Sequence, residues 1–280
     1  MENVDKLIEL AIAEDMPNGD ITSENLVPES HSSFAQITAK EDLIICGLDV
    51  AKKVFKKIDT RLNIETFKKD GDFVKSAMKV MTIQGSTVSI LKAERIALNF
   101  LQRLSGISTH VAKYVEKLKG KGVKILDTRK TTPGFRALEK MAVRLGGGEN
   151  HRMSLSDFVM IKDNHIDAQG SIEKAFLTIK QKVASNIKIE IETRTLNEVE
   201  EAVLLQPDII MLDNMNVETI KKSIDFIRSH EKRKILIEIS GGITFETIRD
   251  FALPGVDYIS VGALTHSVFS SDLSLTFRRM

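Results

Sequence analysis

The chain has one cysteine, almost no net charge and no long apolar run, and each absence excludes a class of protein. Cys46 is alone among 280 residues, so no internal disulfide framework can form, and its apolar surroundings (DLIICGL) favour a buried structural thiol in the cytosol. The 40 lysines and arginines are balanced by 39 aspartates and glutamates, so no global positive field attracts nucleic acid or anionic lipid. No apolar run approaches the roughly 20 residues of a membrane span. We therefore expect a cytoplasmic protein without nucleic-acid or membrane partners.

Targeting and catalytic signatures are missing as well. The N-terminal segment MENVDKLIELAIAEDMP carries acidic residues within its apolar stripe, so we expect neither a secretory signal nor a transit peptide. No cluster of histidines and cysteines has zinc-finger spacing, and no GxSxG elbow occurs. These absences argue against a structural zinc site and against a serine hydrolase of the α/β class.

The first 104 residues have a mixed pattern that predicts an α+β domain. Apolar periodicity favours helices over 3–14 and 48–58, and strands over 34–39, 42–47, 62–68 and 79–84. Residues 88–104 and 107–118 then read as two helices that connect this domain to the next. We expect the domain to span 1–104, a second domain to span 105–268, and a tail, 269–280, to return to the first domain.

From residue 123 onward, short apolar runs alternate with helical stretches. The runs are VKIL, FVMI, IKIEI, DIIML, ILIEI and YISV. Such alternation predicts parallel strands joined by crossover helices. Six strands are two fewer than a complete (β/α)₈ barrel needs, so the pattern predicts an incomplete (β/α) barrel of about six parallel strands. A doubly wound open sheet is the alternative.

Polar residues or glycines follow each of these runs. They are Asp127, Lys162, Glu192, Asp213, Ser240 with Gly241, and Gly262. Parallel strands end at one edge of their sheet, which is where α/β barrels carry their chemistry. The turns SGGIT and VGALTHS follow the last two strands and suit a phosphate, although glycine in a left-handed turn is an equal explanation.

The segment from residue 127 to 165 concentrates cations at this edge. Arg129, Lys130, His151, Arg152 and Lys162 would converge on a ligand with several negative charges, because arginine forks match carboxylate and phosphate oxygens.

Simpler interpretations stand beside this one. Arg136, Lys140 and Arg144 have the spacing of a solvated helix face, and His165 can cap the following segment. Asp127 suits a support for Arg129 or Lys130 better than a catalytic role. Glu192 and Asp213 could hold a ribose diol or a divalent metal, or could balance the cations.

Three motifs in this region, DTRKTTPGFRALEK, AVRLGGGENHR and VMIKDNHI, resemble the quinolinate phosphoribosyltransferase family. Similar stretches run along nearly the whole chain: EDMPNGDITSENLVP, KAERIALNFLQRLSGIST, IEIE, IIMLDN, IEISGGIT and VDYISVGALTHS. The resemblance implies an N-terminal α/β sandwich domain and an incomplete barrel, in at least a dimer. It also implies that quinolinate and phosphoribosyl pyrophosphate react, with Mg²⁺, to nicotinate mononucleotide, pyrophosphate and CO₂.

The resemblance also assigns roles to residues by their position in the matching motifs. The quinolinate ligands would be Arg95 reaching in from a partner subunit, Arg129, His151, Arg152 and Lys162. The phosphoribosyl and phosphate ligands would be Lys130, Glu192, Asp213, Ser240, Gly241, Gly242, Gly262 and His266. Lys130, Lys162, Glu192 and Asp213 would be catalytic, with Glu192 and Asp213 holding the metal directly or through water. Thr193 and Arg194 depart from the family pattern and leave the surroundings of Glu192 open.

Three alternative assignments of the chain remain, and each is distinguished by a different observation. A molybdenum-transport-associated relative shares the fold, but the intact IKDNHI and DTRKT motifs argue against it. An aldolase-like barrel would use Lys162 as a Schiff-base lysine, which borohydride would trap. A phosphate-sugar binding protein would bind its ligand without turnover.

Overall fold

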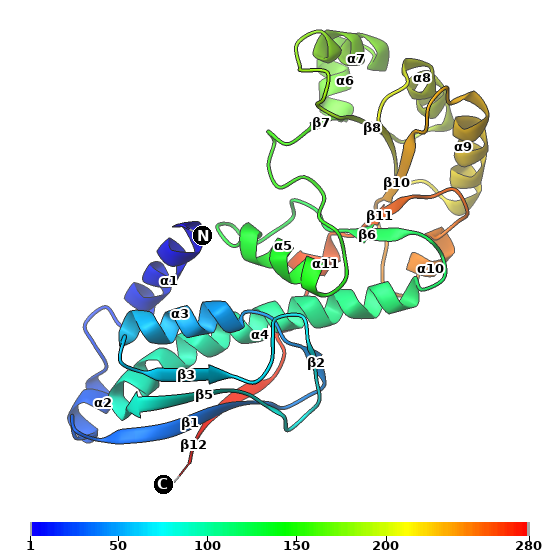
Figure 1. Ribbon diagram of the computed structural model, residues 1–280. Helices are drawn as coiled ribbons and strands as arrows, with labels where there is room; N and C mark the ends of the chain where they lie inside the picture. The colour runs from blue at the N-terminus through cyan, green and yellow to red at the C-terminus, as the bar shows by residue number, and fades with distance from the viewer. Residues whose placement is uncertain (1, 279–280) are drawn as a thin grey trace. The chain divides into compact units, whose positions relative to one another are not determined.

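The computed structural model describes residues 2–278, which form two compact units. The first comprises residues up to 112, 131–147 and 264 onward, and the second comprises 113–130 and 148–263. The chain therefore passes between the units several times, rather than completing one unit before it begins the other. Figure 1 shows the elements of both units.

The first unit is built on a four-stranded antiparallel sheet in the order β12-β1-β5-β3. Its strands are β1 (Ser32–Ala39), β3 (Asn63–Thr66), β5 (Lys79–Ser86) and β12 (Leu273–Arg278), with β2 (Leu43–Ile44) and β4 (Phe73–Val74) forming a separate small pair. Its helices are α1 (Glu2–Asp15), α2 (Ile21–Leu26), α3 (Leu48–Ile58), most of α4 (Thr87–Lys117) and α5 (Arg136–Leu145). The C-terminal strand thus pairs with the first strand of the chain, in the register Ala39 to Leu273.

Helices α3 and α4 lie along one face of this sheet (Figure 1). In α3, Leu48, Ala51, Val54 and Phe55 recur at helical spacing and are buried, so the helix presents one apolar stripe. The helix begins after Gly47, which has a φ of 100° and whose Cβ, if present, would lie 2.9 Å from Leu104 Cδ1. Glycine is therefore required there by both conformation and space.

The expected break between residues 104 and 107 is wrong, because α4 is one continuous helix of 31 residues. Gly106 permits a close approach instead of ending the helix. A Cβ on Gly106 would lie 2.2 Å from the carbonyl oxygen of Phe269, and Ser271 N donates a hydrogen bond to Gln102 O nearby. The segment that leads into β12 therefore crosses α4 at the residue that has no side chain.

The second unit contains the predicted parallel strands. They are β6 (Lys124–Leu126), β7 (Val159–Ile161), β8 (Ile189–Thr193), β9 (Ile209–Asp213), β10 (Leu236–Ser240) and β11 (Tyr258–Ser260). Their order is β6-β11-β10-β9-β8-β7, every described pairing is parallel, and β6 and β7 remain as edges. The prediction of an incomplete six-stranded barrel is confirmed.

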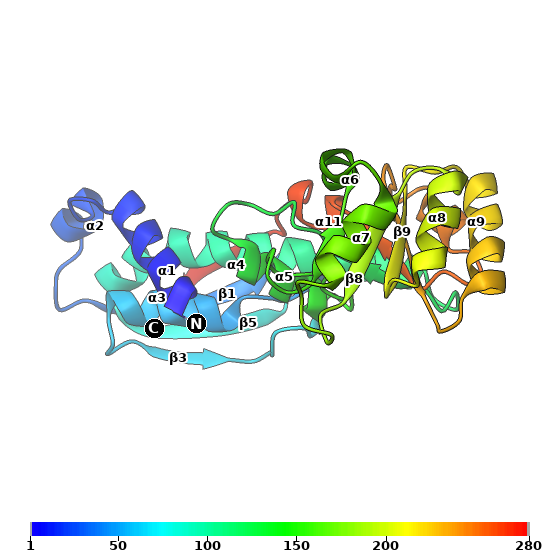
Figure 2. The ribbon, with the colours of Figure 1, turned by 90° about the horizontal axis from the view of Figure 1, so that it is seen from above.

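Helices cover the outer side of this sheet. They are α6 (Asp163–Gln169), α7 (Ile172–Lys180), α8 (Leu196–Leu205), α9 (Val217–His230) and α10 (Ile248–Phe251), followed by α11 (Ala263–His266) at the boundary of the units. Helices α8 and α9 lie side by side in both views (Figure 1, Figure 2). Because the strands are parallel and in register, with Ser240 opposite Asp213 and Ser260 opposite Leu126, their carboxyl ends share one edge.

Helix α5 differs from its predicted solvated character. Glu139 and Lys140 have no exposed surface, whereas Arg144 is exposed. Glu139 accepts hydrogen bonds from Arg103 Nη2 at 2.9 Å and from Thr132 Oγ1 at 2.9 Å. The interpretation of this helix face as solvated is therefore wrong at Lys140, because the helix is packed on that side.

Candidate active site

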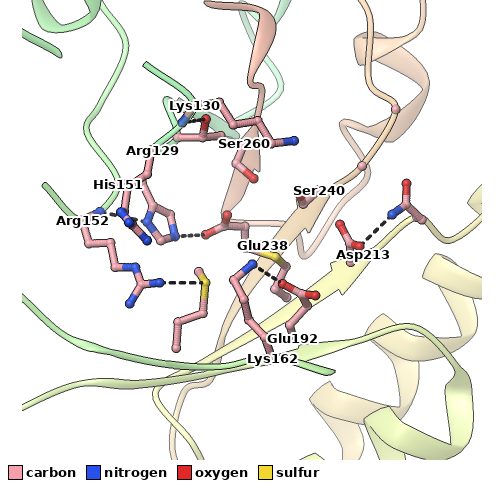
Figure 3. A pocket seen from close by; sticks show the side chains of 16 residues that line it. Arg129, Lys130, His151, Arg152, Lys162, Glu192, Asp213, Glu238, Ser240 and Ser260 are labelled. Carbon is pink, nitrogen blue, oxygen red and sulfur yellow. Dashed lines mark hydrogen bonds and ion pairs between the residues drawn. The ribbon is translucent and has the colours of Figure 1, made fainter. Parts of the chain in front are cut away.

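A cavity of about 490 Å³ opens at the shared edge of the parallel strands. Its lining comes entirely from the second unit and includes these residues singled out from the sequence: Arg129, Lys130, His151, Arg152, Lys162, Glu192, Asp213, Ser240, Gly241 and Gly242. In Figure 3, the basic groups of Arg129, His151 and Arg152 lie on one side, and Asp213 and Ser240 lie on the other. The cavity thus separates a cationic wall from a wall of carboxylate, hydroxyl and glycine main chain.

Lys162 and Glu192 face each other across neighbouring strand ends. Lys162 Nζ donates to Glu192 Oε2 at 2.7 Å; the lysine side chain is 42% exposed and the glutamate side chain 9%. Lys162 is also the N-cap residue of α6, and His165 Nδ1 accepts a hydrogen bond from Lys162 N at 3.0 Å. The interpretation of His165 as a cap is confirmed.

The two residues that depart from the family pattern have distinct structural roles. Thr193 is buried, and its hydroxyl donates to Met211 O at 2.8 Å, so it belongs to the packed sheet. Arg194 forms an ion pair with Asp163 and lies 4.0 Å from Glu192 Oε1. Glu192 is therefore placed between the cations of Lys162 and Arg194.

Arg152 belongs to the cationic wall and is 8% exposed. Its guanidinium donates to Phe158 O at 3.3 Å and lies 5.8 Å from the centre of the Phe158 ring. Burial, together with the charge of Arg129, lowers the pKa of Arg152. An anion that binds beside Arg129 and Arg152 would offset the repulsion between the two guanidinium groups, which favours anion binding at this wall.

Asp127 supports the loop that carries His151 and Arg152. Its fully buried carboxylate accepts from His151 N at 2.9 Å and from Asn150 Nδ2 at 2.5 Å. The side chain follows β6, as expected, and these bonds fix the main chain of the next rim segment. Asp127 thus supports the segment of Asn150 and His151, and its expected support of Arg129 or Lys130 stays a prediction.

The environment of His151 was not foreseen from the sequence. Its Nε2 lies 3.2 Å from Glu190 Oε2 and 3.5 Å from Glu238 Oε2, and its Nδ1 lies 2.8 Å from Arg152 N. Burial alone would lower the pKa of His151, but the adjacent carboxylates of Glu190 and Glu238 raise it to about 9. Burial and the charge of Glu238 raise the pKa of Glu190. A charged ring carries a proton on Nδ1, so protonation would push this atom away from the N–H of Arg152.

Sequence reasoning missed Glu190 and Glu238, although a signal was present. Each is an acidic residue in the middle of an apolar run, IKIEI or ILIEI, where a packed strand offers no solvent. A charge at such a position requires a partner, because an isolated ionised carboxylate is very costly to bury.

Carboxylates occur at two places that could bind a metal cation. Glu192 and Asp213 both line the cavity at the ends of neighbouring strands and offer the oxygen ligands that Mg²⁺ prefers. His151, Glu190 and Glu238 also bring ligand atoms within 4.8 Å of one another. At that second place a metal on Nε2 would require the proton on Nδ1, where it would meet the N–H of Arg152, so the arrangement disfavours a metal there.

The glycine turn after β10 allows its main chain to lie close to Asn214. Gly241 has a φ of 94°, and its Cβ would lie 2.3 Å from Asn214 Oδ1, so another residue would displace Asn214, which directly follows β9. Gly242 follows with a φ of 60°, and nothing within 4 Å would meet its Cβ. Main-chain groups of this turn are therefore accessible from the cavity.

Three residues to which the family resemblance assigns a ligand role are not part of this lining. Gly262 lies in the second unit after β11, His266 ends α11 in the first unit, and Arg95 is exposed on α4 in the first unit. The cavity therefore brings together the cationic residues of the central segment with the ends of β8, β9 and β10.

The fold and the cavity define a barrel-like α/β protein that can hold a multiply anionic small molecule, and the comparisons identify the family. Residues 20–105 match the N-terminal domain of quinolinate phosphoribosyl transferase, and residues 107–276 match its C-terminal domain. The chain belongs to the quinolinate phosphoribosyltransferase family.

Individual relatives agree over nearly the whole chain. A probable nicotinate-nucleotide pyrophosphorylase [carboxylating] of Bacillus subtilis is 42% identical, covering 96% of this chain and 92% of the relative. A mitochondrial quinolinate phosphoribosyltransferase [decarboxylating] of Nicotiana glauca is 41% identical, covering 96% and 81%. The solved nicotinate-nucleotide pyrophosphorylase of Francisella tularensis is 39% identical, with a TM-score of 0.93 over 99% of this chain and 96% of that one. Within residues 2–278, no helix has the length and apolar character of a membrane span.

Proposed function

We propose that the chain transfers the phosphoribosyl group of phosphoribosyl pyrophosphate to quinolinate, with loss of CO₂, in NAD biosynthesis. The products are nicotinate mononucleotide and pyrophosphate. The observation that carries this proposal is the cavity with cationic and carboxylate-bearing walls, in a chain of this family. A planar dicarboxylate fits the first wall and a sugar phosphate fits the second.

The cationic wall would bind quinolinate. Arg129 and Arg152 offer guanidinium forks, Lys162 offers an ammonium group, and His151 lies beside them. Forks match carboxylates in a plane, so the wall supplies orientation as well as charge. Lys162 would exchange its partner Glu192 for a substrate carboxylate.

The opposite wall would bind the phosphoribosyl group. Glu192 and Asp213 would orient the ribose hydroxyls, and the main chain of Ser240, Gly241 and Gly242 would hold phosphate oxygens. Lys130 would face the leaving pyrophosphate. Glu192 and Asp213 are also the residues that would hold Mg²⁺, directly or through water, and a bound Mg²⁺ would neutralise pyrophosphate charge.

The reaction follows from how these groups position charge. The pyridine nitrogen forms a bond to ribose C1 as the bond from C1 to pyrophosphate breaks, through an oxocarbenium-like state that the carboxylates stabilise. The nitrogen becomes cationic. The bond to the carboxylate on ring carbon 2 then breaks, CO₂ leaves, the pyridinium stabilises the electron pair on carbon 2, and a proton replaces the carboxylate.

The chain would work as at least a dimer with shared sites. Arg95 is exposed on α4, and its proposed role is to complete the quinolinate site of a partner subunit. Gly262 and His266 would add to the phosphate-binding loops. We also propose a cytoplasmic location; the curated plant relatives include a mitochondrial and a chloroplastic protein.

The aldolase-like alternative is disfavoured by the surroundings of Lys162. A Schiff-base lysine must be neutral to attack a carbonyl, whereas Lys162 Nζ donates to the Glu192 carboxylate at 2.7 Å. The experiment that tests the proposal is incubation of the purified chain with quinolinate, phosphoribosyl pyrophosphate and Mg²⁺, while CO₂ and nicotinate mononucleotide are measured. Release of both in equal amounts supports the proposal, and binding without product would contradict it.

A further inference from the structure

Two glutamates lie buried beneath the cavity, and the proposed reaction gives them no role. Glu190 in β8 and Glu238 in β10 have no exposed surface. They come from alternate strands, since β9 lies between β8 and β10. Inward side chains from alternate strands share a layer in α/β barrels, which explains how residues far apart in the sequence meet. Glu238 also contributes to the lining of the cavity.

These carboxylates face a histidine and no neutral donor. No hydrogen-bond donor of residues 2–278 meets their oxygens at hydrogen-bonding geometry, and the ion-pair partner of both is His151 Nε2, at 3.2 and 3.5 Å. Two buried carboxylates so close together are strongly unfavourable unless a shared partner offsets them. The charge of His151 is therefore the partner that offsets the repulsion between the two glutamates.

The other side of the imidazole ring contacts the main chain of Arg152. Arg152 N lies 2.8 Å from His151 Nδ1, and the Arg152 side chain enters the cationic wall. Nε2, the ring nitrogen beside the carboxylates, carries a proton both in the neutral ring, whose Nδ1 accepts from Arg152 N, and in the charged ring, because only the proton on Nδ1 differs between the two states. A displacement of the ring would consequently be passed to the loop that carries Arg152.

We propose that Glu190 and Glu238 are positioning residues that act through His151: they hold its Nε2–H and thereby fix the ring and the adjoining Arg152 in the anion-binding wall. The proposal concerns the same site as the proposed function and rests on it for the identity of the anion, quinolinate. It has a second consequence. With His151 removed, both carboxylates would face the bound dianion without an intervening donor and would repel it.

The first test needs no substrate. Nuclear magnetic resonance of the ligand-free, ¹⁵N-labelled full chain should detect the Nε2–H of His151, protected from exchange with water by the carboxylates. Glu190→Gln and Glu238→Gln keep the shape of the side chain and should each shift this signal and hasten its exchange. Glu65→Gln, on the exposed strand β3, is the matched control and should leave it unchanged. An unaltered signal in both buried variants would overturn the proposal, even if quinolinate proved not to be the substrate.

The second test is a cycle of quinolinate affinities measured by calorimetry. Each single glutamine variant should weaken quinolinate binding about tenfold to a hundredfold, by analogy with the loss found when the hydrogen-bond partner of a metal-ligating histidine is removed. Phosphoribosyl pyrophosphate should bind as before. His151→Ala should weaken quinolinate further, and His151→Ala with Glu238→Gln should bind it more tightly than His151→Ala alone. Additive losses would show that the glutamates do not act through His151 and would overturn the proposal.

Discussion

Lys162 Nζ and Glu192 Oε2 lie 2.7 Å apart, so the ends of the neighbouring strands β7 and β8 are joined by an ion pair in the lining of the cavity. The pair joins a proposed quinolinate ligand to a proposed ribose ligand. A substrate carboxylate that approaches Lys162 must compete with Glu192, and the outcome can be measured.

Glu192→Gln is expected to strengthen quinolinate binding and to slow turnover. A pair with one side chain 42% exposed is worth at most about 1 kcal/mol, so the gain in affinity should not exceed about fivefold. The loss of a charge that stabilises the oxocarbenium-like state should lower kcat by about 10². Calorimetry and steady-state kinetics on the same preparation check both effects. A weaker affinity for quinolinate with an unchanged kcat would mean that the pair has no such role.

The variants Arg152→Ala and Asp213→Ala should show that quinolinate and phosphoribosyl pyrophosphate are bound by separate halves of the site. Removing Arg152, which is 8% exposed, takes a fork from the dicarboxylate wall, so quinolinate affinity should fall by about 2–5 kcal/mol while phosphoribosyl pyrophosphate binds nearly as before. Asp213→Ala should have the opposite selectivity. Titration calorimetry of each variant with each ligand provides the comparison, and equal losses for both ligands would refute the division.

The strand ends were predictable from the sequence because they follow a local rule. Each apolar run gave one parallel strand, and the shared edge of parallel strands brought Lys162, Glu192 and Asp213 together. The pairing of Glu190 and Glu238 with His151 was not predictable in that way. It depends on side chains that alternate strands of the folded sheet bring together, and a local sequence pattern does not contain the order of those strands.

The continuity of α4 could not be predicted either. Gly106 lies within the expected break, and an interior glycine is destabilising by about 1 kcal/mol relative to alanine. The packing of the Phe269 main chain against the glycine outweighs this preference. The partner of Gly106 is more than 160 positions away in the chain, so no local pattern contains it.

Arg95 is expected to act in the site of a partner subunit. Arg95→Ala and Lys162→Ala should each be inactive as pure proteins and should regain activity when co-expressed. One site of a mixed dimer carries both defects and the other carries neither, so random assortment should restore about a quarter of wild-type sites. Co-expression of Arg152→Ala with Lys162→Ala is the matched control: both residues line one cavity, so no intact site can form. Mixed dimers that form, by native mass spectrometry, and stay inactive would exclude the role in trans.

Quinolinate binding should depend on pH through His151. Its pKa is raised from 6.5 to about 9, so the folded state holds the proton more tightly than the unfolded state. The resulting stabilisation is fully present below pH 6.5 and is lost as the pH rises through about 9. We expect quinolinate affinity to fall over the upper part of this window in the wild type, and to be nearly independent of pH there in His151→Gln. Histidine NMR titration and calorimetry from pH 6 to 10 check it; a His151 midpoint at or below 6.5 would contradict the raised pKa.

The most direct measurement compares quinolinate with nicotinate as acceptors, each supplied with phosphoribosyl pyrophosphate and Mg²⁺. Nicotinate lacks the carboxylate on ring carbon 2 and would leave buried cationic groups, Arg152 among them, without a partner. A site built around charged partners rejects an analogue that lacks them by a factor of about 10⁴. The account predicts mononucleotide and CO₂ in equal amounts from quinolinate and no mononucleotide from nicotinate. Equal turnover of nicotinate, or no product from quinolinate, would contradict it.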